Sequence, residues 1–144
     1  MRVNTKCSIA LHCLLFIAEY GDSMKVTGDL LAKSTGCHAA AIRSILGALR
    51  KNNVITIHRG VGGAKLAHSC ESITIWEVYH ALEPQGSEHI MALHPHPNPQ
   101  CPIGKQVDRV LKTTYQPIVK AIEETMKTMT LQDLMNCYHE EKDG

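Results

Sequence analysis

Residues 27–68 read TGDLLAKSTGCHAAAIRSILGALRKNNVITIHRGVGGAKLAH, and this stretch decides the fold. Its first part predicts a short helix over 27–34 with Thr27 as the N-cap. After a turn that contains glycine, a second helix is predicted over 38–52, because its apolar residues recur at helical spacing. These core positions are Ile42, Ile45, Leu46 and Leu49. Two helices joined by a short glycine turn form a helix-turn-helix.

The rest of the stretch alternates with the period of a β-strand. Residues 54–58 predict one strand, and residues 64–68 predict the strand that returns. The glycine-rich segment 60–63 lies between them. A hairpin directly after a helix-turn-helix is typical of the wing of a winged-helix domain.

The sequence on both sides extends this domain. Apolar residues between positions 5 and 20 have helical spacing, with Thr5 as the predicted N-cap and Gly21 as the stop. A further helix is predicted over 74–83. We therefore expect a mainly α fold with a small β-hairpin, in which residues 1–83 form a winged helix-turn-helix DNA-binding domain.

The rear of the chain is organised differently. Residues 84–102 hold five of the six prolines and are predicted as a proline-rich loop between two units. A long amphipathic helix follows, which Pro117 should kink or split near residue 113. With a last helix expected over about 131–139, residues 103–144 are predicted to form the dimerisation helices.

The apolar stripe of the long helix is larger than one small domain needs to cover. We expect the surplus to be buried against the same helix of a second chain, giving a homodimer that binds a palindromic site. The alternative is that this helix packs only on its own domain. The residues expected at the dimer contact are Val107, Val110, Leu111, Ile118 and Ile122.

The net charge of +1 conceals an uneven distribution. Residues 1–82 carry nine Lys and Arg against five Asp and Glu, whereas residues 83–144 carry six against nine. This asymmetry indicates that only the front half meets a polyanion. Because no run is long enough to span a membrane and none resembles a signal peptide, we expect a cytoplasmic protein whose six cysteines are thiols.

The basic bias and the order of the elements favour double-stranded DNA as the partner. Small side chains at the start of the 38–52 helix would let it enter the major groove, where Arg43 can pair with guanine. Arg59, at the base of the wing, would reach the minor groove. An ordinary solvated helix and an ordinary surface hairpin are the alternatives. The predicted DNA contacts are Arg2, Thr5, Thr27, His38, Ala39, Ala40, Arg43, Ser44, Arg50, Lys51, Arg59 and Lys65.

Several segments resemble the Rrf2 family of regulators, the IscR, NsrR and CymR type. They are MRVNTK at 1–6, LGALRK at 46–51, RGVGGAKL at 59–66 and SITIWEV at 72–78. Two further segments resemble the YwnA-like branch of that family, namely HPNPQCPIGK at 96–105 and LQDLM at 131–135. The resemblance covers nearly the whole chain. It implies a dimeric winged-helix transcription regulator, which we expect to be a repressor.

The cysteines depart from the family pattern. Cluster-binding members place three cysteines before the long helix, whereas this chain has only Cys101 between residues 71 and 136, so we expect no iron–sulfur cluster. Cys101 would sit at the N-cap of the long helix, where the helix dipole favours a reactive thiolate. Cys37 precedes the second helix of the helix-turn-helix. Both are candidates for redox sensing, against the alternative of thiols that only fill space.

Two other function classes were weighed against the regulator. A small metal- or thiol-dependent enzyme could use His94, His96 and Cys101, with His89 nearby, but a solvated, proline-stiffened loop is the favoured interpretation. No nucleophile–base pair and no phosphate-binding loop is recognisable, so we expect neither catalysis nor a cofactor. A winged-helix adaptor that binds protein would usually lack the basic bias described above.

Overall fold

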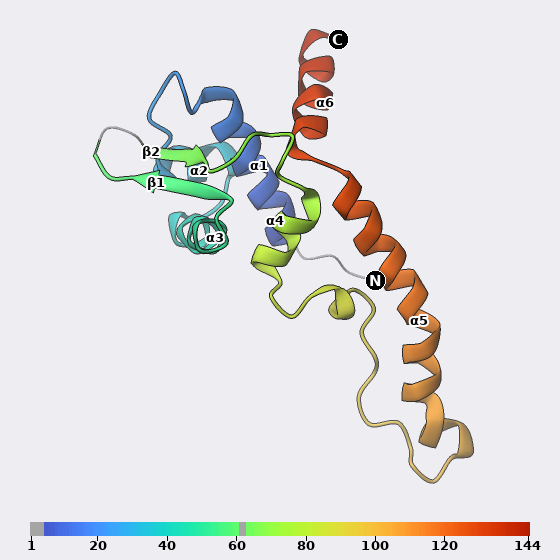
Figure 1. The fold of residues 1–144 in the computed structure, drawn as a ribbon. Helices are drawn as coiled ribbons and strands as arrows, with labels where there is room; N and C mark the ends of the chain where they lie inside the picture. Colours follow the sequence, from blue (N-terminus) through green and yellow to red (C-terminus); the bar gives the residue numbers. More distant parts are fainter. Residues whose placement is uncertain (1–4, 61–62) are drawn as a thin grey trace.

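Within residues 5–60 and 63–144, which the computed structural model describes, the chain is mainly helical with one β-hairpin (Figure 1). The expected fold class is therefore confirmed. The elements in order are α1 (Thr5–Tyr20), α2 (Gly28–Thr35), α3 (Ala39–Lys51), β1 (Ile55–His58), β2 (Gly63–Leu66), α4 (Ile75–Leu82), the 3-10 helix η1 (Ser87–Ile90), α5 (Pro102–Thr128) and α6 (Leu131–Asp143).

The helix-turn-helix forms as its local sequence predicts. The Thr27 hydroxyl accepts a hydrogen bond of 3.2 Å from the Leu30 amide and caps α2. Gly36 ends α2 with φ at 73°, a left-handed conformation that glycine adopts without strain. The four predicted core positions of α3 are all buried: Ile42, Ile45, Leu46 and Leu49.

α1 lies at the centre of the winged domain and contacts α2, α3, α4, α6 and β2. Its described part begins at Thr5, which is already helical, so the structure does not bear out Thr5 as the N-cap. The core draws fully buried aliphatic side chains from six elements and three connecting segments, and each contributes about 1.5–3 kcal/mol through its burial. The largest are Leu14, Leu31, Ile42, Leu49, Ile55, Ile73 and Leu131.

The wing is held to the helical body by a third backbone segment. β1 and β2 pair antiparallel, and the Ala64 amide also donates a hydrogen bond of 2.9 Å to the Val26 carbonyl. The predicted strand over 64–68 was placed too late, because β2 starts at Gly63, where the bridge to Val26 forms, and ends at Leu66. This second partner lies outside the hairpin, and the hairpin pattern alone does not reveal it.

Gly63 provides a test of the wing anchor. Its φ is +67°, and an added Cβ would lie 2.7 Å from the Val26 carbonyl oxygen. We expect Gly63→Ala to lower the free energy of unfolding by at least about 2 kcal/mol in urea denaturation, through left-handed strain and this clash. Gly60→Ala is the matched control, since Gly60 has φ at +84° and open space around its Cβ position. Equal losses in the two variants would show that the contact with Val26 does not anchor the wing.

α5 is one continuous helix, so of the two effects predicted for Pro117, a kink or a split near residue 113, the split does not occur. Proline removes only the hydrogen bond to the carbonyl four residues earlier, and Thr113 is exposed, so water can reach that carbonyl. The Thr113 and Thr114 hydroxyls also bond back to the carbonyls of Arg109 and Val110, both at 2.9 Å. The helix extends away from the winged domain (Figure 1).

The segment predicted as a loop over 84–102 contains one short helix, η1, which the sequence pattern did not indicate. Ile90 of η1 is buried, and the Ser87 hydroxyl donates a hydrogen bond of 3.1 Å to the Glu123 carboxylate on α5. On the same side of α5, Lys127 lies 5.5 Å from the ring centre of Trp76, which stacks on His80 of α4. These contacts join α4 and η1 to the C-terminal half of α5.

The end of α5 is joined to the winged domain by backbone hydrogen bonds. The Ile75 amide donates to the Met129 carbonyl at 2.9 Å, and the Leu131 amide donates to the Ile73 carbonyl at 2.8 Å. α6 then begins with a capping box formed by Thr130 and Asp133. It continues to Asp143, four residues beyond the predicted end, and its first residue completes the core.

Candidate nucleic-acid interface and dimerisation face

The exposed face of α3 carries mostly small side chains. Ala40, Arg43, Ser44 and Gly47 are all exposed and recur at the spacing of one helical face, opposite the buried stripe. His38 is exposed at the N-cap without a side-chain capping bond, and Ala39 is half-buried. Small side chains beside an arginine allow a helix to approach the edges of base pairs closely. Gly47 was not among the predicted contacts, although its spacing from Ala40 places it there.

Basic side chains border this face. Arg50 and Lys51 are exposed at the end of α3, and Arg59 is exposed beside the wing. Within the part of the chain that is described, these three cations and Arg43 form no ion pair. Their charges therefore remain available for phosphates, which attract such groups in a strongly salt-dependent manner.

Three other predicted contacts are placed differently. The Thr27 hydroxyl caps α2, so its first role is structural. The Lys65 ammonium lies 3.9 Å from the Asp22 carboxylate, an exposed pair that contributes little stability. Thr5 is exposed on the first turn of α1, and Arg2 lies outside the described residues.

Sequence reasoning missed Lys25. This exposed residue packs against the start of β2, where its side chain would be 3.0 Å from a Cβ added at Gly63. The bridge between Val26 and Gly63 creates this contact between segments 37 residues apart. Lys25 therefore adds a further basic group to the side of the domain that carries the wing.

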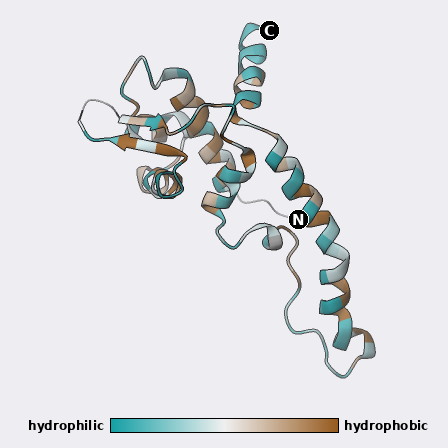
Figure 2. Cartoon of the chain, in the orientation of Figure 1, coloured by the Kyte–Doolittle hydropathy of each residue, from teal (hydrophilic) through white to brown (hydrophobic). Residues whose placement is uncertain are grey.

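α5 presents an apolar stripe that its own chain does not cover. None of its 27 residues is buried, and Ile103, Val110 and Ile118 are 76%, 56% and 44% exposed. Figure 2 shows apolar positions recurring along this extended helix. Of the five predicted dimer residues, Val107 and Leu111 are half-buried, while Ile122 packs partly against the core of its own domain.

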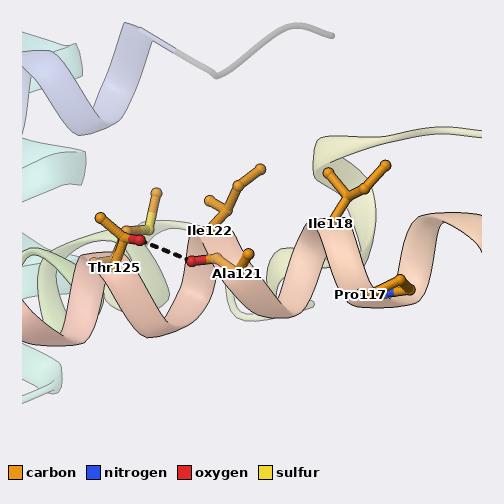
Figure 3. Close-up of a pocket in the computed structure, with 6 residues that line it drawn as sticks. Pro117, Ile118, Ala121, Ile122 and Thr125 are labelled. Carbon is orange, nitrogen blue, oxygen red and sulfur yellow. Dashed lines mark hydrogen bonds between the residues drawn. The ribbon is translucent and has the colours of Figure 1, made fainter.

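The middle of this stripe is hollowed into a groove of about 610 Å³ (Figure 3). Ile118 and Ile122 project from the same side of the helix in that view. The groove is almost entirely apolar, and an uncovered apolar groove on a helix is a contact surface for another apolar surface. Its lining residues are Pro117, Ile118, Ala121, Ile122, Thr125 and Met126.

The six cysteines are all free thiols. Cys7 and Cys13 are buried on α1, as expected for core residues. Cys101 is the half-buried N-cap of α5, with Pro102 as the first helical residue, as predicted, and its thiol makes no capping bond. Cys37 is half-buried, and its thiol lies 3.8 Å from the Thr35 carbonyl oxygen.

The thiol of Cys13 predicts a dependence of stability on alkaline pH. Burial, assisted by the nearby Cys37, raises the pKa of Cys13 from the ordinary 9.0 to about 11. Because the folded state holds this proton more tightly, the associated stability is complete below pH 9 and is lost as pH rises through about 11. We expect Cys13→Ala to remove about 2 kcal/mol of this loss in denaturant titrations at pH 8–11. Cys137→Ala, at an exposed thiol, should follow the wild type, and parallel curves for all three proteins would contradict the assignment.

The described residues contain no group of three His, Cys, Asp or Glu side chains that could hold a metal ion. His94 and His96 are exposed, and they do not form such a group with Cys101. Thiolate-bound clusters take several cysteines, whereas the segment before α5 offers one. This donor set does not fit an iron–sulfur cluster. Separately, no described helix is both long and apolar enough to cross a lipid bilayer.

Comparison with known proteins identifies the family. Residues 3–137 match the Rrf2 family model, which is described as an iron-dependent transcriptional regulator. YwnA of Bacillus subtilis, provisionally described as an HTH-type transcriptional regulator, is 31% identical over 134 residues, 93% of this chain and 97% of that protein. Both results confirm the resemblance drawn from the sequence motifs.

Solved structures agree with the fold. A crystal structure of a protein provisionally described as DNA-binding has a TM-score of 0.72 and 27% identity, and the match covers 90% of this chain and 98% of that one. IscR of T. potens has a TM-score of 0.73 at 20% identity, with 98% and 90% covered, which supports the fold alone. The family description calls its members iron-dependent. The single cysteine before α5 and the exposed His94 and His96 do not form a matching set of iron ligands within the described residues.

Proposed function

This chain belongs to the Rrf2 family of transcriptional regulators, and on that premise we propose that it is a homodimeric repressor that binds a palindromic operator in the cytoplasm. The observation that carries the proposal is the exposed face of α3 beside the wing, which combines small side chains with basic ones. In this proposal residues 1–83 bind the DNA and residues 103–144 form the dimer contact. Residues 84–102 connect these two parts. The YwnA description and the DNA-binding structural relative support the same assignment.

Each protomer is proposed to read one half-site. The start of α3 enters the major groove, with Arg43 on a base edge and the small side chains of Ala40 and Ser44 against the groove floor. Arg59 reaches into the adjacent minor groove. Arg50 and Lys51 bind phosphates and fix the register of α3 on the duplex.

The dimer is proposed to form through the apolar stripe of α5. A two-fold arrangement buries the same groove on both copies and repeats the α3 face at a fixed distance, which matches a palindromic site. Because the end of α5 is hydrogen-bonded to residues 73 and 75, shortly after the wing, a change in the angle between the two α5 helices would move both wings.

The proposal is tested by selecting genomic DNA fragments with the purified full-length protein at two salt concentrations. We expect enrichment of an inverted repeat, with affinity falling steeply as salt rises. An oligomer measurement by light scattering in the same buffers should give a dimer. If no duplex is enriched under any condition, the repressor assignment is wrong, and a protein-binding adaptor becomes the better account.

We propose that a thiol response of this regulator acts at Cys101 or Cys37. Both thiols are half-buried, whereas Cys7 and Cys13 lie in the core. Cys101 begins the dimerisation helix, and Cys37 directly precedes the His38 cap of α3. Operator binding would be compared before and after hydrogen peroxide in wild type, Cys101→Ser and Cys37→Ser. An unchanged response in both variants would exclude these two thiols.

A further inference from the structure

A second cavity, of about 580 Å³, lies on the winged domain away from the α5 groove. α1 provides most of its wall, the end of α2 closes one side, and α6 closes another. We refer to it as the α1–α6 cavity. Its volume falls within the range of small-molecule sites, which is about 300–1,000 Å³. The side chains that give it an apolar and aromatic wall are Leu11, Leu15, Phe16, Tyr20 and Tyr138.

Polar groups stand at two places on this wall. His12 Nε2 and Ser34 Oγ share a hydrogen bond of 2.8 Å that links α1 to α2. Glu19 Oε2 and His139 Nε2 are also 2.8 Å apart and link α1 to α6. Small-molecule sites combine mostly apolar walls with a few such groups that orient the ligand.

Two aromatic rings of the cavity wall, both on α1, pack against each other. The ring centres of Phe16 and Tyr20 are 5.1 Å apart with their planes tilted by 52°. Partial burial, together with the adjacent Tyr20, raises the pKa of the Tyr138 phenol above its ordinary value. Among the lining residues, Glu19 alone carries a full charge on a carboxylate or ammonium group.

We propose that the α1–α6 cavity binds a small planar aromatic molecule that carries a hydroxyl or amino group and no negative charge. The ring would pack on Phe16 and Leu15, where apolar and offset aromatic contacts are favourable. The polar substituent would bond to the His12 and Ser34 pair, which offers both a donor and an acceptor. An aromatic acid is excluded because its carboxylate would lie near Glu19 without a matching cation on the wall.

The position of the cavity gives the ligand a regulatory consequence, and this step rests on the proposed function. Ser34 belongs to α2, the first helix of the helix-turn-helix, while Tyr138 belongs to α6, which follows the dimerisation helix. A ligand that replaces the His12–Ser34 bond would change how α2 sits on α1. Because a ligand shifts an equilibrium by its differential affinity for the two states, operator affinity would change with occupancy.

The test uses three probes that share a 4-hydroxyphenyl ring and differ in charge: p-cresol, tyramine and 4-hydroxyphenylacetate. Binding to the full-length protein at pH 8 is measured by isothermal titration calorimetry and saturation-transfer NMR. We expect saturable binding of p-cresol and tyramine, and binding of 4-hydroxyphenylacetate that is at least about tenfold weaker. Absence of saturable binding for the neutral and cationic probes, or preference for the acid, overturns the proposal.

Two variants place the binding in this cavity. Leu15→Trp should fill it and abolish probe binding, and Ser34→Ala should weaken p-cresol by about fivefold or more through loss of a hydrogen-bonding group. Ser69→Ala is the matched control, because Ser69 is an exposed serine that hydrogen-bonds to Ser72 at 2.9 Å, outside the cavity. If Leu15→Trp does not fold by circular dichroism, Ser34→Ala decides. Probe affinity equal to wild type in the folded variants overturns the proposal.

Operator binding is measured on the same samples. This measurement distinguishes a failure of the ligand proposal from a failure of the proposed DNA-binding function. A wild type that binds its operator but no probe retains its proposed function and loses the ligand site. A wild type that binds p-cresol but no DNA retains the site and loses the proposed function. If no probe binds to the wild type and Leu15→Trp changes only the dimer dissociation constant, the cavity belongs to a contact between copies. That result contradicts the ligand proposal.

Discussion

Replacing Ile118 by aspartate is expected to convert the dimer into monomers and to weaken operator binding by at least about a hundredfold. Ile118 lies on the uncovered groove of α5 and is 44% exposed in the single chain, so the substitution leaves the protomer's own core intact. In a two-fold dimer it would place two unpaired carboxylates in an apolar contact, at a cost of several kcal/mol for each buried charge. The monomer would then read only one half-site.

The oligomeric state is measured by light scattering over a range of protein concentrations, and operator affinity by fluorescence anisotropy. Gln116→Asp provides the matched control, because Gln116 is exposed on the opposite face of the same helix. It introduces the same charge and should leave the dimer intact. A dimer that survives Ile118→Asp with unchanged affinity would mean that α5 is covered by something other than a second copy.

Replacing Arg43 by alanine is expected to weaken binding to the selected operator by at least about thirtyfold. An arginine that bonds to a guanine edge contributes about 1–3 kcal/mol of discrimination, and a dimer carries this residue twice. The loss should be confined to one symmetric pair of positions in the site, where the variant becomes tolerant of any base. Arg43 is exposed and makes no ion pair within the described chain, so the fold should be unaffected.

Arg50→Ala separates base reading from phosphate binding. This variant should lose affinity evenly across operator sequences and should show a shallower salt dependence, because it removes a phosphate contact. Lys33→Ala, at an exposed lysine of α2 outside the proposed contacts, should match the wild type. If Arg43→Ala behaves like Arg50→Ala, then Arg43 binds the phosphate backbone and the sequence is read elsewhere.

The helix-turn-helix was predictable because its signals are local. The stripe of α3 and the Thr27 cap of α2 depend on residues within one or two turns, and both are present in the structure. For Pro117 the sequence left two outcomes open, a kink and a split near residue 113. The local effect of this proline is real, but whether a helix breaks depends on the free energy of the whole 27-residue element, which tolerates one missing hydrogen bond.

The features that were missed depend on distant segments. Lys25 joins the wing side only through the bridge between Val26 and Gly63, and η1 is fixed by Ser87 reaching Glu123 on α5. The α1–α6 cavity likewise combines His12, Ser34 and Tyr138, which no sequence spacing relates. The sequence pattern predicted that α5 carries more apolar residues than its own domain covers. That Ile122 packs partly against the core of its own domain could be seen only in the structure.

Trp76 stacks on His80 and lies next to Lys127, so its intrinsic fluorescence reports on this contact. Trp76 is the single tryptophan of the chain, so all indole emission arises at the junction of α4 and α5. Any rotation of the dimerisation helix against the winged domain alters the distance of the Lys127 ammonium and the contact with the imidazole, and with them the emission. A movement of α5 against the winged domain on binding of DNA or of a ligand, as proposed above, would thus be followed in solution without attaching a dye.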